Sequence, residues 1–199
     1  MVENYMNEII LIIGLFFALI EWFGEYFDHR WVIYISKPLV MVSIIAWIIL
    51  QIDFGIIFGS DVMLPIIWFL AGMIFCLFGD IFLMGGERLF IPGLVSFLIG
   101  HIFFINGFNQ LSPKVDYIVP GLIVLGIVVS VTVRIFIELS KGLEARSQTK
   151  MKIPVAIYSI VISIMLYAAL LTLMEREWNY QAALLVAFGA LFFYISDVL

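Results

Sequence analysis

Two aspartates and one histidine are the residues whose types and positions point most directly to chemistry. Asp80 and Asp197 lie inside long apolar runs, and His101 lies in the middle of another. A carboxylate in membrane hydrocarbon costs at least about 2.5 kcal/mol, so an aspartate in such a run is a functional candidate by default. Carboxyl and imidazole groups perform general acid and base catalysis, and they also build proton pathways. Both kinds of function are open from these residues alone.

Each of these residues also has a purely structural interpretation. An aspartate can be solvated at the membrane interface or paired with a lysine, and Lys37 is the candidate partner. Lys37 can equally hold a lipid phosphate or extend to the headgroups. His101 can be a buried ring that bonds to a neighbouring carbonyl group. Tyr158 and Asn106 are weaker candidates, since both can be packing residues with a satisfied polar tip.

The composition identifies the solvent around these residues. Of the 199 residues, 64% are hydrophobic and 13% are charged, whereas soluble domains have about 45–50% and about 25%. A soluble core of this size cannot bury 19 Phe, 5 Trp and 8 Tyr. The composition therefore predicts an integral membrane protein.

Seven apolar runs make up most of the chain. A transmembrane helix needs about 20 apolar residues, and no polar segment between the runs is long enough for a soluble domain. We predict an all-α, polytopic helical membrane bundle that forms one integral membrane domain over residues 1–199. The expected spans are residues 6–23, 33–50, 64–84, 90–108, 117–136, 153–174 and 181–199.

The ten Lys and Arg predict the orientation. Short cytoplasmic loops hold most basic residues of a membrane protein. The first, third and fifth loops, with the adjoining helix ends, carry eight of the ten, and only Lys114 and Arg176 lie elsewhere. The N-terminus is therefore predicted to lie outside, and we expect the protein in the plasma membrane of a bacterium. The last run then ends abruptly at Leu199, and we expect an eighth span beyond it.

Several function classes lack the residues that they need. The single Cys76 cannot form an intrachain disulfide, and two histidines, His29 and His101, cannot build a three-histidine zinc site. The frame of a G-x-S-x-G nucleophile is absent around Ser96 and Ser196. No metal or cofactor is expected, and no basic patch with aromatic residues indicates nucleic-acid binding.

Two pairs of segments in the sequence resemble each other, and we call this internal similarity the echo. It aligns Asp80 with Asp197, 117 positions apart. GMIFCLFGDIFL at Gly72–Leu83 matches GALFFYISDVL at Gly189–Leu199. At nearly the same offset, SKPLVMVS and KIPVAIYS match near the starts of the second and sixth runs. True repeats four spans apart would share one orientation, about an axis along the membrane normal. The two aspartates would then lie at one depth and could face each other, unless the echo is a chance likeness between apolar segments.

Stripes of small residues lead to both aspartates and to the histidine. Small residues at helical spacing let neighbouring backbones approach closely. The three stripes are Gly72 and Gly79, Gly189 and Ser196, and Gly93, Ser96 and Gly100.

Two motifs in successive runs carry a family likeness. They are F-G-D-I-F-L at Phe78–Leu83 and G-L-V-S-F-L-I-G-H-I-F-F at Gly93–Phe104. Together with Ser36–Leu39, Tyr158–Ala169 and Ile195–Asp197, they resemble the YhhN family of membrane proteins, whose animal members are lysoplasmalogenases. The likeness covers roughly residue 33 to the end of the chain. Members of that family typically carry about eight spans, one more than this chain shows.

The resemblance implies hydrolysis of the vinyl ether bond of a lysoplasmalogen. The substrate would be a lysophospholipid within the bilayer, and the products a fatty aldehyde and a glycerophospho-ethanolamine or -choline. An acid protonates the alkene carbon, water captures the oxocarbenium ion, and the resulting hemiacetal collapses. Glycoside hydrolysis is related chemistry, in which one carboxyl group is the acid and another activates water.

This reaction gives each candidate residue a role. Asp80 and Asp197 would be the acid and the base, in either order, while His101 would orient water or substitute as the acid. The expected substrate-binding residues are Lys37, Tyr158 and Asn106. A transporter or sensor of a lipid or small solute, with the aspartates as a proton relay, is the competing hypothesis.

Overall fold

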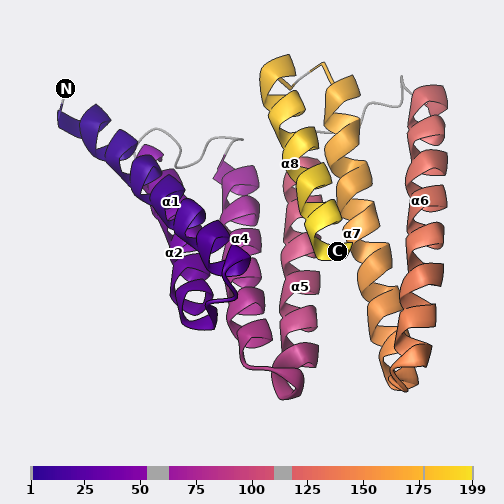
Figure 1. Cartoon of the computed structure of the whole chain (residues 1–199). Helices are drawn as coiled ribbons and strands as arrows, with labels where there is room; N and C mark the ends of the chain where they lie inside the picture. Colours follow the sequence, from indigo (N-terminus) through magenta and orange to yellow (C-terminus); the bar gives the residue numbers. More distant parts are fainter. Residues whose placement is uncertain (1, 53–62, 110–117, 177, 199) are drawn as a thin grey trace. The chain divides into compact units, whose positions relative to one another are not determined.

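Seven long helices dominate the computed structural model, which describes residues 2–52, 63–109, 118–176 and 178–198 (Figure 1). Their apolar lengths suit a membrane span in each case. The long helices are α1 (Val2–Tyr26), α2 (Arg30–Gln51), α4 (Met63–Met84), α5 (Phe90–Asn109), α6 (Ile118–Ala145), α7 (Lys152–Leu171) and α8 (Tyr180–Val198). Short 3-10 helices adjoin them at η1 (Glu87–Leu89), η3 (Thr149–Met151) and η4 (Thr172–Met174). The predicted all-α architecture with seven spans is confirmed.

The largest boundary difference is at the end of α6. The expected span ended at residue 136, but the helix continues to Ala145. Its last two turns contain good helix formers and no proline, and Lys141 forms an ion pair with Glu138, 2.8 Å away. Hydropathy locates the apolar part of a helix, and it does not detect a polar extension of this kind.

Many large apolar side chains on these helices are exposed. In a membrane protein the hydrocarbon of the lipid covers such surfaces, so they need no protein partner. Examples from different helices are Leu15, Trp22, Val119, Ile153 and Leu185.

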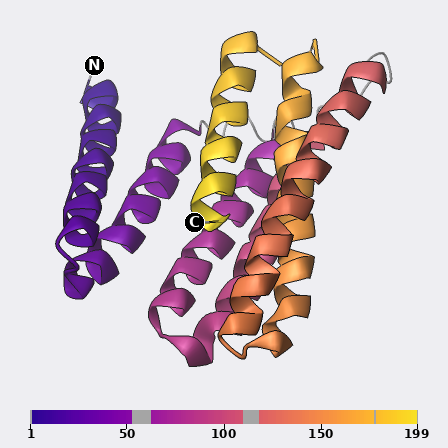
Figure 2. The same ribbon diagram turned by 45° about the vertical axis from the view of Figure 1, so that its right-hand side comes forward.

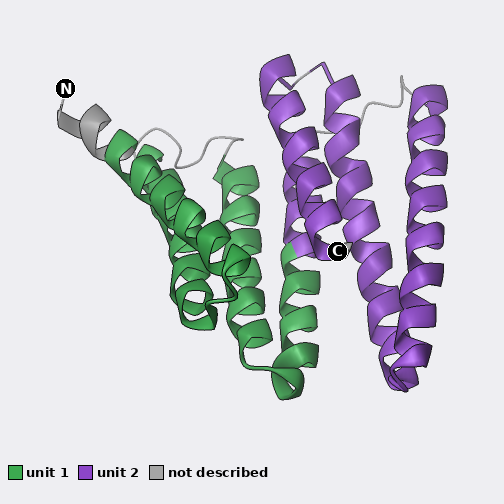
Figure 3. Ribbon diagram, in the orientation of Figure 1, with its two compact units in different colours: residues 1–100 green, residues 101–199 purple. Residues whose placement is uncertain are grey.

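The chain divides into two compact units, residues 1–100 and 101–199 (Figure 3). The boundary falls inside α5, so that helix contributes its first half to one unit and its second half to the other. In the first unit α2 packs against both α1 and α4. In the second unit α7 packs against both α6 and α8, as Figure 2 also shows. The prediction of one membrane domain is not tested by this division.

The two units share local features that agree with an internal repeat. The turn after α1 and the turn after α6 each contain a left-handed residue, Asp28 with φ 51° and Ser147 with φ 58°. In both turns the next amide bonds to the carbonyl group five residues earlier, which is the helix-ending Schellman pattern. These bonds run from His29 to Gly24 and from Gln148 to Leu143.

The aligned serines of the echo behave alike as well. The Ser43 hydroxyl donates to the Leu39 carbonyl oxygen at 2.7 Å, and the Ser159 hydroxyl donates to that of Val155 at 2.8 Å. Each helix that carries one of the two aspartates packs on the helix with the aligned serine. A serine that donates to its own helix in this way is common in apolar helices, so the internal repeat stays a prediction.

Glycines bring α4 and α5 close together within the first unit. A Cβ atom on Gly93 would lie 3.3 Å from the carbonyl oxygen of Gly79, and one on Gly100 would lie 3.0 Å from that of Gly72. Both distances leave less room than a side chain needs. The close approach predicted for these two stripes is confirmed. Gly189 differs, because a Cβ atom there meets nothing within 4 Å in the described part of the chain.

We expect Gly100→Ala to destabilise the packing of α4 on α5 by about 1–3 kcal/mol. The added Cβ would lie 2.8 Å from the sulfur of Cys76 and 3.0 Å from the backbone of Gly72, so the helices must separate. The midpoint of chemical unfolding in detergent micelles measures this change. Gly189→Ala is the matched control and should leave the midpoint unchanged or raise it slightly, because alanine favours a helix more than glycine does. Equal midpoints for the two variants would contradict the close approach.

Candidate functional site

Three of the predicted site residues form a hydrogen-bonded triad in the second unit. His101 lies on α5, Tyr158 on α7 and Asp197 on α8. The Tyr158 hydroxyl oxygen is 3.0 Å from Nε2 of His101. The same hydroxyl donates to Oδ2 of Asp197, and that oxygen is 3.9 Å from Nε2 of His101. Tyr158 therefore bridges the imidazole and the carboxylate.

The imidazole of the triad is enclosed. His101 has no exposed surface, whereas the Asp197 side chain is 20% exposed. The Phe193 ring stands perpendicular to the imidazole with a centroid distance of 5.2 Å, and the Phe104 ring lies 6.4 Å away. Nδ1 of His101 is buried and has no hydrogen-bond partner among the residues that the structure describes. A titratable group in such a place is a common property of functional sites.

The other aspartate forms an ion pair in the first unit. Oδ1 of Asp80, on α4, is 3.2 Å from Nζ of Lys37, on α2. The Asp80 side chain is 11% exposed and that of Lys37 is 40% exposed. Glu21 and Glu25 of α1 also lie near enough for their charges to act on Lys37. The sequence left open whether Lys37 pairs with an aspartate, binds a lipid phosphate or extends to the headgroups. The ion pair with Asp80 is present in the structure, and binding of a phosphate by Lys37 stays a prediction.

The packing of the helices explains why the pair forms. α2 lies against α4, and Gly79 beside the aspartate brings α5 close on the adjoining face. Ser36 is buried beside Lys37, and its hydroxyl donates to the Val32 carbonyl oxygen one turn earlier at 2.7 Å. A charged side chain at this depth requires a partner of opposite sign, and the neighbouring helix supplies it.

The two aspartates belong to different units. Asp80 is in residues 1–100 and Asp197 is in residues 101–199. Their facing arrangement, expected from the echo, stays a prediction.

Asn106 has a local role in the structure. Its side-chain amide donates to the carbonyl oxygen of Ile102, one turn earlier on α5, at 2.8 Å. That bond gives the polar tip a partner, which agrees with the structural interpretation of Asn106 as a packing residue. A role of Asn106 in binding substrate is not tested by this geometry.

A second polar cluster was missed by the sequence analysis. The Thr132 hydroxyl of α6 is 2.7 Å from that of Ser163 on α7 and 3.1 Å from that of Tyr194 on α8. Ser163 and Tyr194 are both buried. Single hydroxyl residues in apolar runs bond readily to their own helix, so nothing in the sequence distinguished these three.

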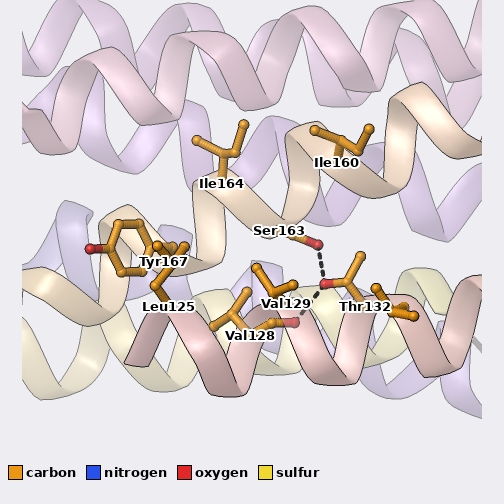
Figure 4. Close-up of a pocket in the computed structure, with 9 residues that line it drawn as sticks. Leu125, Val128, Val129, Thr132, Ile160, Ser163, Ile164 and Tyr167 are labelled. Carbon is orange, nitrogen blue, oxygen red and sulfur yellow. Dashed lines mark hydrogen bonds between the residues drawn. The ribbon is translucent and has the colours of Figure 1, made fainter. Parts of the chain in front are cut away.

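This cluster borders a groove of about 210 Å³ between α6 and α7 (Figure 4). Thr132 and Ser163 lie side by side at one part of it, and the rest of the lining is largely aliphatic. The groove is lined by Leu125, Val128, Val129, Thr132, Val133, Ile160, Ser163, Ile164 and Tyr167. The groove belongs to the second unit, and one of its two helices, α7, also carries Tyr158.

The arrangement can transfer protons. It offers an imidazole, a phenol and a carboxylate in one hydrogen-bonded series, and a separate carboxylate paired with an ammonium group. Among the described residues, no three His, Cys, Asp or Glu side chains gather as metal ligands would.

Comparison with protein families gives a match over most of the chain. The model of the YhhN family matches residues 32–199, a range that includes all six predicted site residues. The comparisons with curated proteins and with solved structures give no match.

Proposed function

Because this chain belongs to the YhhN family over residues 32–199, we propose that it is a membrane-embedded hydrolase of the lysoplasmalogenase type. The substrate is a lysophospholipid that carries a vinyl ether, and it reaches the protein from the bilayer. Water adds to the vinyl ether carbon that bears the oxygen, and the carbon–oxygen bond to glycerol then breaks. The products are a fatty aldehyde and a glycerophospho-ethanolamine or -choline.

The observation that carries this proposal is the triad of His101, Tyr158 and Asp197. Vinyl ether hydrolysis needs a group that gives a proton to carbon and a group that takes one from water. Imidazole does both near neutral pH, and the apolar rings around His101 suit a lipid chain. The triad lies on apolar helices, and its Asp197 side chain, 20% exposed, is where a membrane lipid would approach it.

In this proposal the acid and base chemistry depends on Asp80, Asp197 and His101. The ion pair with Lys37 favours the ionised form of Asp80, and we assign this carboxylate to stabilising the positive charge of the oxocarbenium ion. Lys37 is 40% exposed, and we assign it to the phosphate of the headgroup. We also place the protein in the plasma membrane of a bacterium. The distribution of its basic residues supports an N-terminus on the outside.

Release of aldehyde tests the proposal. Purified full-length protein in lipid nanodiscs is given a lysoplasmalogen, and in parallel an ester lysophospholipid with the same headgroup and chain length. We expect aldehyde from the vinyl ether lipid and no fatty acid from the ester lipid. Protein that is folded by circular dichroism and turns over neither lipid would contradict the proposal.

A lipid or solute transporter that relays protons is the second candidate. The shared local features of the two units favour it, because internal repeats are common in transporters. Such a protein would move its solute together with protons across a sealed vesicle without forming a product. The aldehyde assay therefore separates the two functions.

A further inference from the structure

The hydrogen bonds of the triad determine which nitrogen of His101 carries the proton. A phenol has one hydrogen, and Tyr158 donates it to Asp197. The bond between Tyr158 and Nε2 of His101, at 3.0 Å, must therefore use a hydrogen from the imidazole. In the neutral ring this places the hydrogen on Nε2 and leaves Nδ1 as a bare acceptor.

The bare nitrogen is buried without a partner. Nδ1 of His101 meets no donor in the described segments, and the residue has no exposed surface. A buried acceptor without a hydrogen bond costs about 1–3 kcal/mol. An unpaired buried group in a folded protein calls for an explanation, and a catalytic role is one of the recognised ones.

We propose that Nδ1 of His101 is the atom that exchanges protons with substrate and water, and that Tyr158 and Asp197 are positioning residues that keep the other ring hydrogen on Nε2. This inference rests on the proposed function and deepens it. The carboxylate of Asp197 acts through the Tyr158 hydroxyl. It also stabilises the positive charge of the imidazolium, since its Oδ2 is 3.9 Å from Nε2.

The reaction balances with water as the only co-reactant. Imidazolium gives its Nδ1 proton to the alkene carbon that does not bear oxygen, and the π electrons form the new C–H bond. Water attacks the oxocarbenium carbon, and Nδ1 takes a proton from that water, which restores the imidazolium. The hemiacetal then breaks its bond to the glycerol oxygen. Its hydroxyl proton passes to that oxygen, so that an aldehyde and an alcohol leave.

Each aspartate has its own partner, and these partners support the roles proposed for Asp197 and His101. Asp197 accepts a hydrogen bond from Tyr158, and Asp80 is in an ion pair with Lys37. Both carboxyl groups are thereby used as acceptors, which suits the ionised form. Among the six predicted site residues, His101 is then the group with a free position for the transferred proton.

Nitrogen NMR of the imidazole tests the assignment without any substrate. The chain has two histidines, so His29→Gln, a change at an exposed position before α2, leaves His101 as the only signal. The ¹⁵N-labelled protein is measured in nanodiscs while the pH is raised until the nitrogen signals no longer change, which identifies the neutral ring. We expect a protonated Nε2 and a bare Nδ1. A hydrogen on Nδ1 of the neutral ring would overturn the inference.

Two variants of Asp197 test its action through Tyr158. Asp197→Ala frees the tyrosine hydrogen, which can then be donated to Nε2, so the ring hydrogen should move to Nδ1. Asp197→Asn keeps an acceptor for tyrosine and should leave the hydrogen on Nε2. If Asp197→Ala leaves the tautomer unchanged, the positioning role is wrong.

The NMR measurement of the tautomer and the aldehyde assay test different claims, so one claim can fail while the other stands. A bare Nδ1 with no aldehyde from the wild-type protein would overturn the hydrolase and leave the hydrogen-bond assignment intact. Aldehyde release from a protein with a protonated Nδ1 in the neutral ring would overturn the inference and leave the hydrolase standing.

Discussion

His101→Gln is expected to lower kcat for aldehyde release by about 10²–10⁴-fold, the usual contribution of a general acid or base. Glutamine can still donate a hydrogen bond to Tyr158 through its amide, so the contact at 3.0 Å has a replacement. It cannot exchange a proton with substrate or water. The loss should therefore appear in kcat, with a KM close to that of the wild-type protein.

The control for this variant is the other histidine. His29 is exposed in the turn between α1 and α2 and belongs to the first unit. His29→Gln should keep the full rate. Turnover by folded His101→Gln within a factor of about three of the wild-type rate would remove the imidazole from the chemistry, because acid and base catalysis contribute at least about 10²-fold.

The spans could be predicted because each depends on composition within one stretch of chain. A run of about 20 apolar residues has no stable place outside a bilayer, whatever its neighbours are. The end of α6 could not be located in this way. Its extension to Ala145 depends on helix propensity and on the local pair of Glu138 and Lys141, which hydropathy does not measure.

The types of the site residues were predictable for the same reason. A polar group in hydrocarbon is costly, so Asp80, Asp197 and His101 could be selected one at a time. The bonding partners of these residues were harder to predict, because each partner lies far from its residue in the sequence. Tyr158 follows His101 by 57 positions and precedes Asp197 by 39, and only the packing of three helices brings the side chains together.

The glycine stripes show both the value and the limit of a pattern. Gly79 and Gly93, like Gly72 and Gly100, allow close approach because another helix lies on that face. Gly189 has the same spacing to its aspartate, but no described atom lies within 4 Å of a Cβ there. Spacing indicates which residues share a helix face, and the partner of that face depends on the whole fold.

Asp80→Asn in a Lys37→Met background is expected to lower kcat by about 10²-fold or more relative to Lys37→Met alone. The ion pair of 3.2 Å explains why a single change is not informative. Asp80→Asn by itself leaves an ammonium group without its partner in an apolar helix. That change destabilises the protein by about 1–3 kcal/mol, less than for a fully buried pair because Lys37 is partly exposed.

The double variant separates a loss of catalysis from a loss of stability, because both side chains of the ion pair become neutral. Methionine matches the length and apolar character of the lysine stem, and asparagine matches the shape of aspartate, so the packing of α2 on α4 should be retained. Stability in nanodiscs should return close to that of the wild-type protein. The Lys37→Met single variant leaves the Asp80 carboxylate without its ion-pair partner, so its rate is measured per folded protein. It should raise KM if the lysine binds the phosphate, and it should retain a measurable kcat.

The comparison between the two Lys37→Met proteins isolates the carboxylate. If Asp80 stabilises the oxocarbenium ion, its removal costs rate even when no lysine remains to be paired. If the double variant turns over as fast as Lys37→Met, the carboxylate has no function beyond the ion pair. The chemistry would then belong to His101, Tyr158 and Asp197 alone, and the second unit would carry the whole proton transfer.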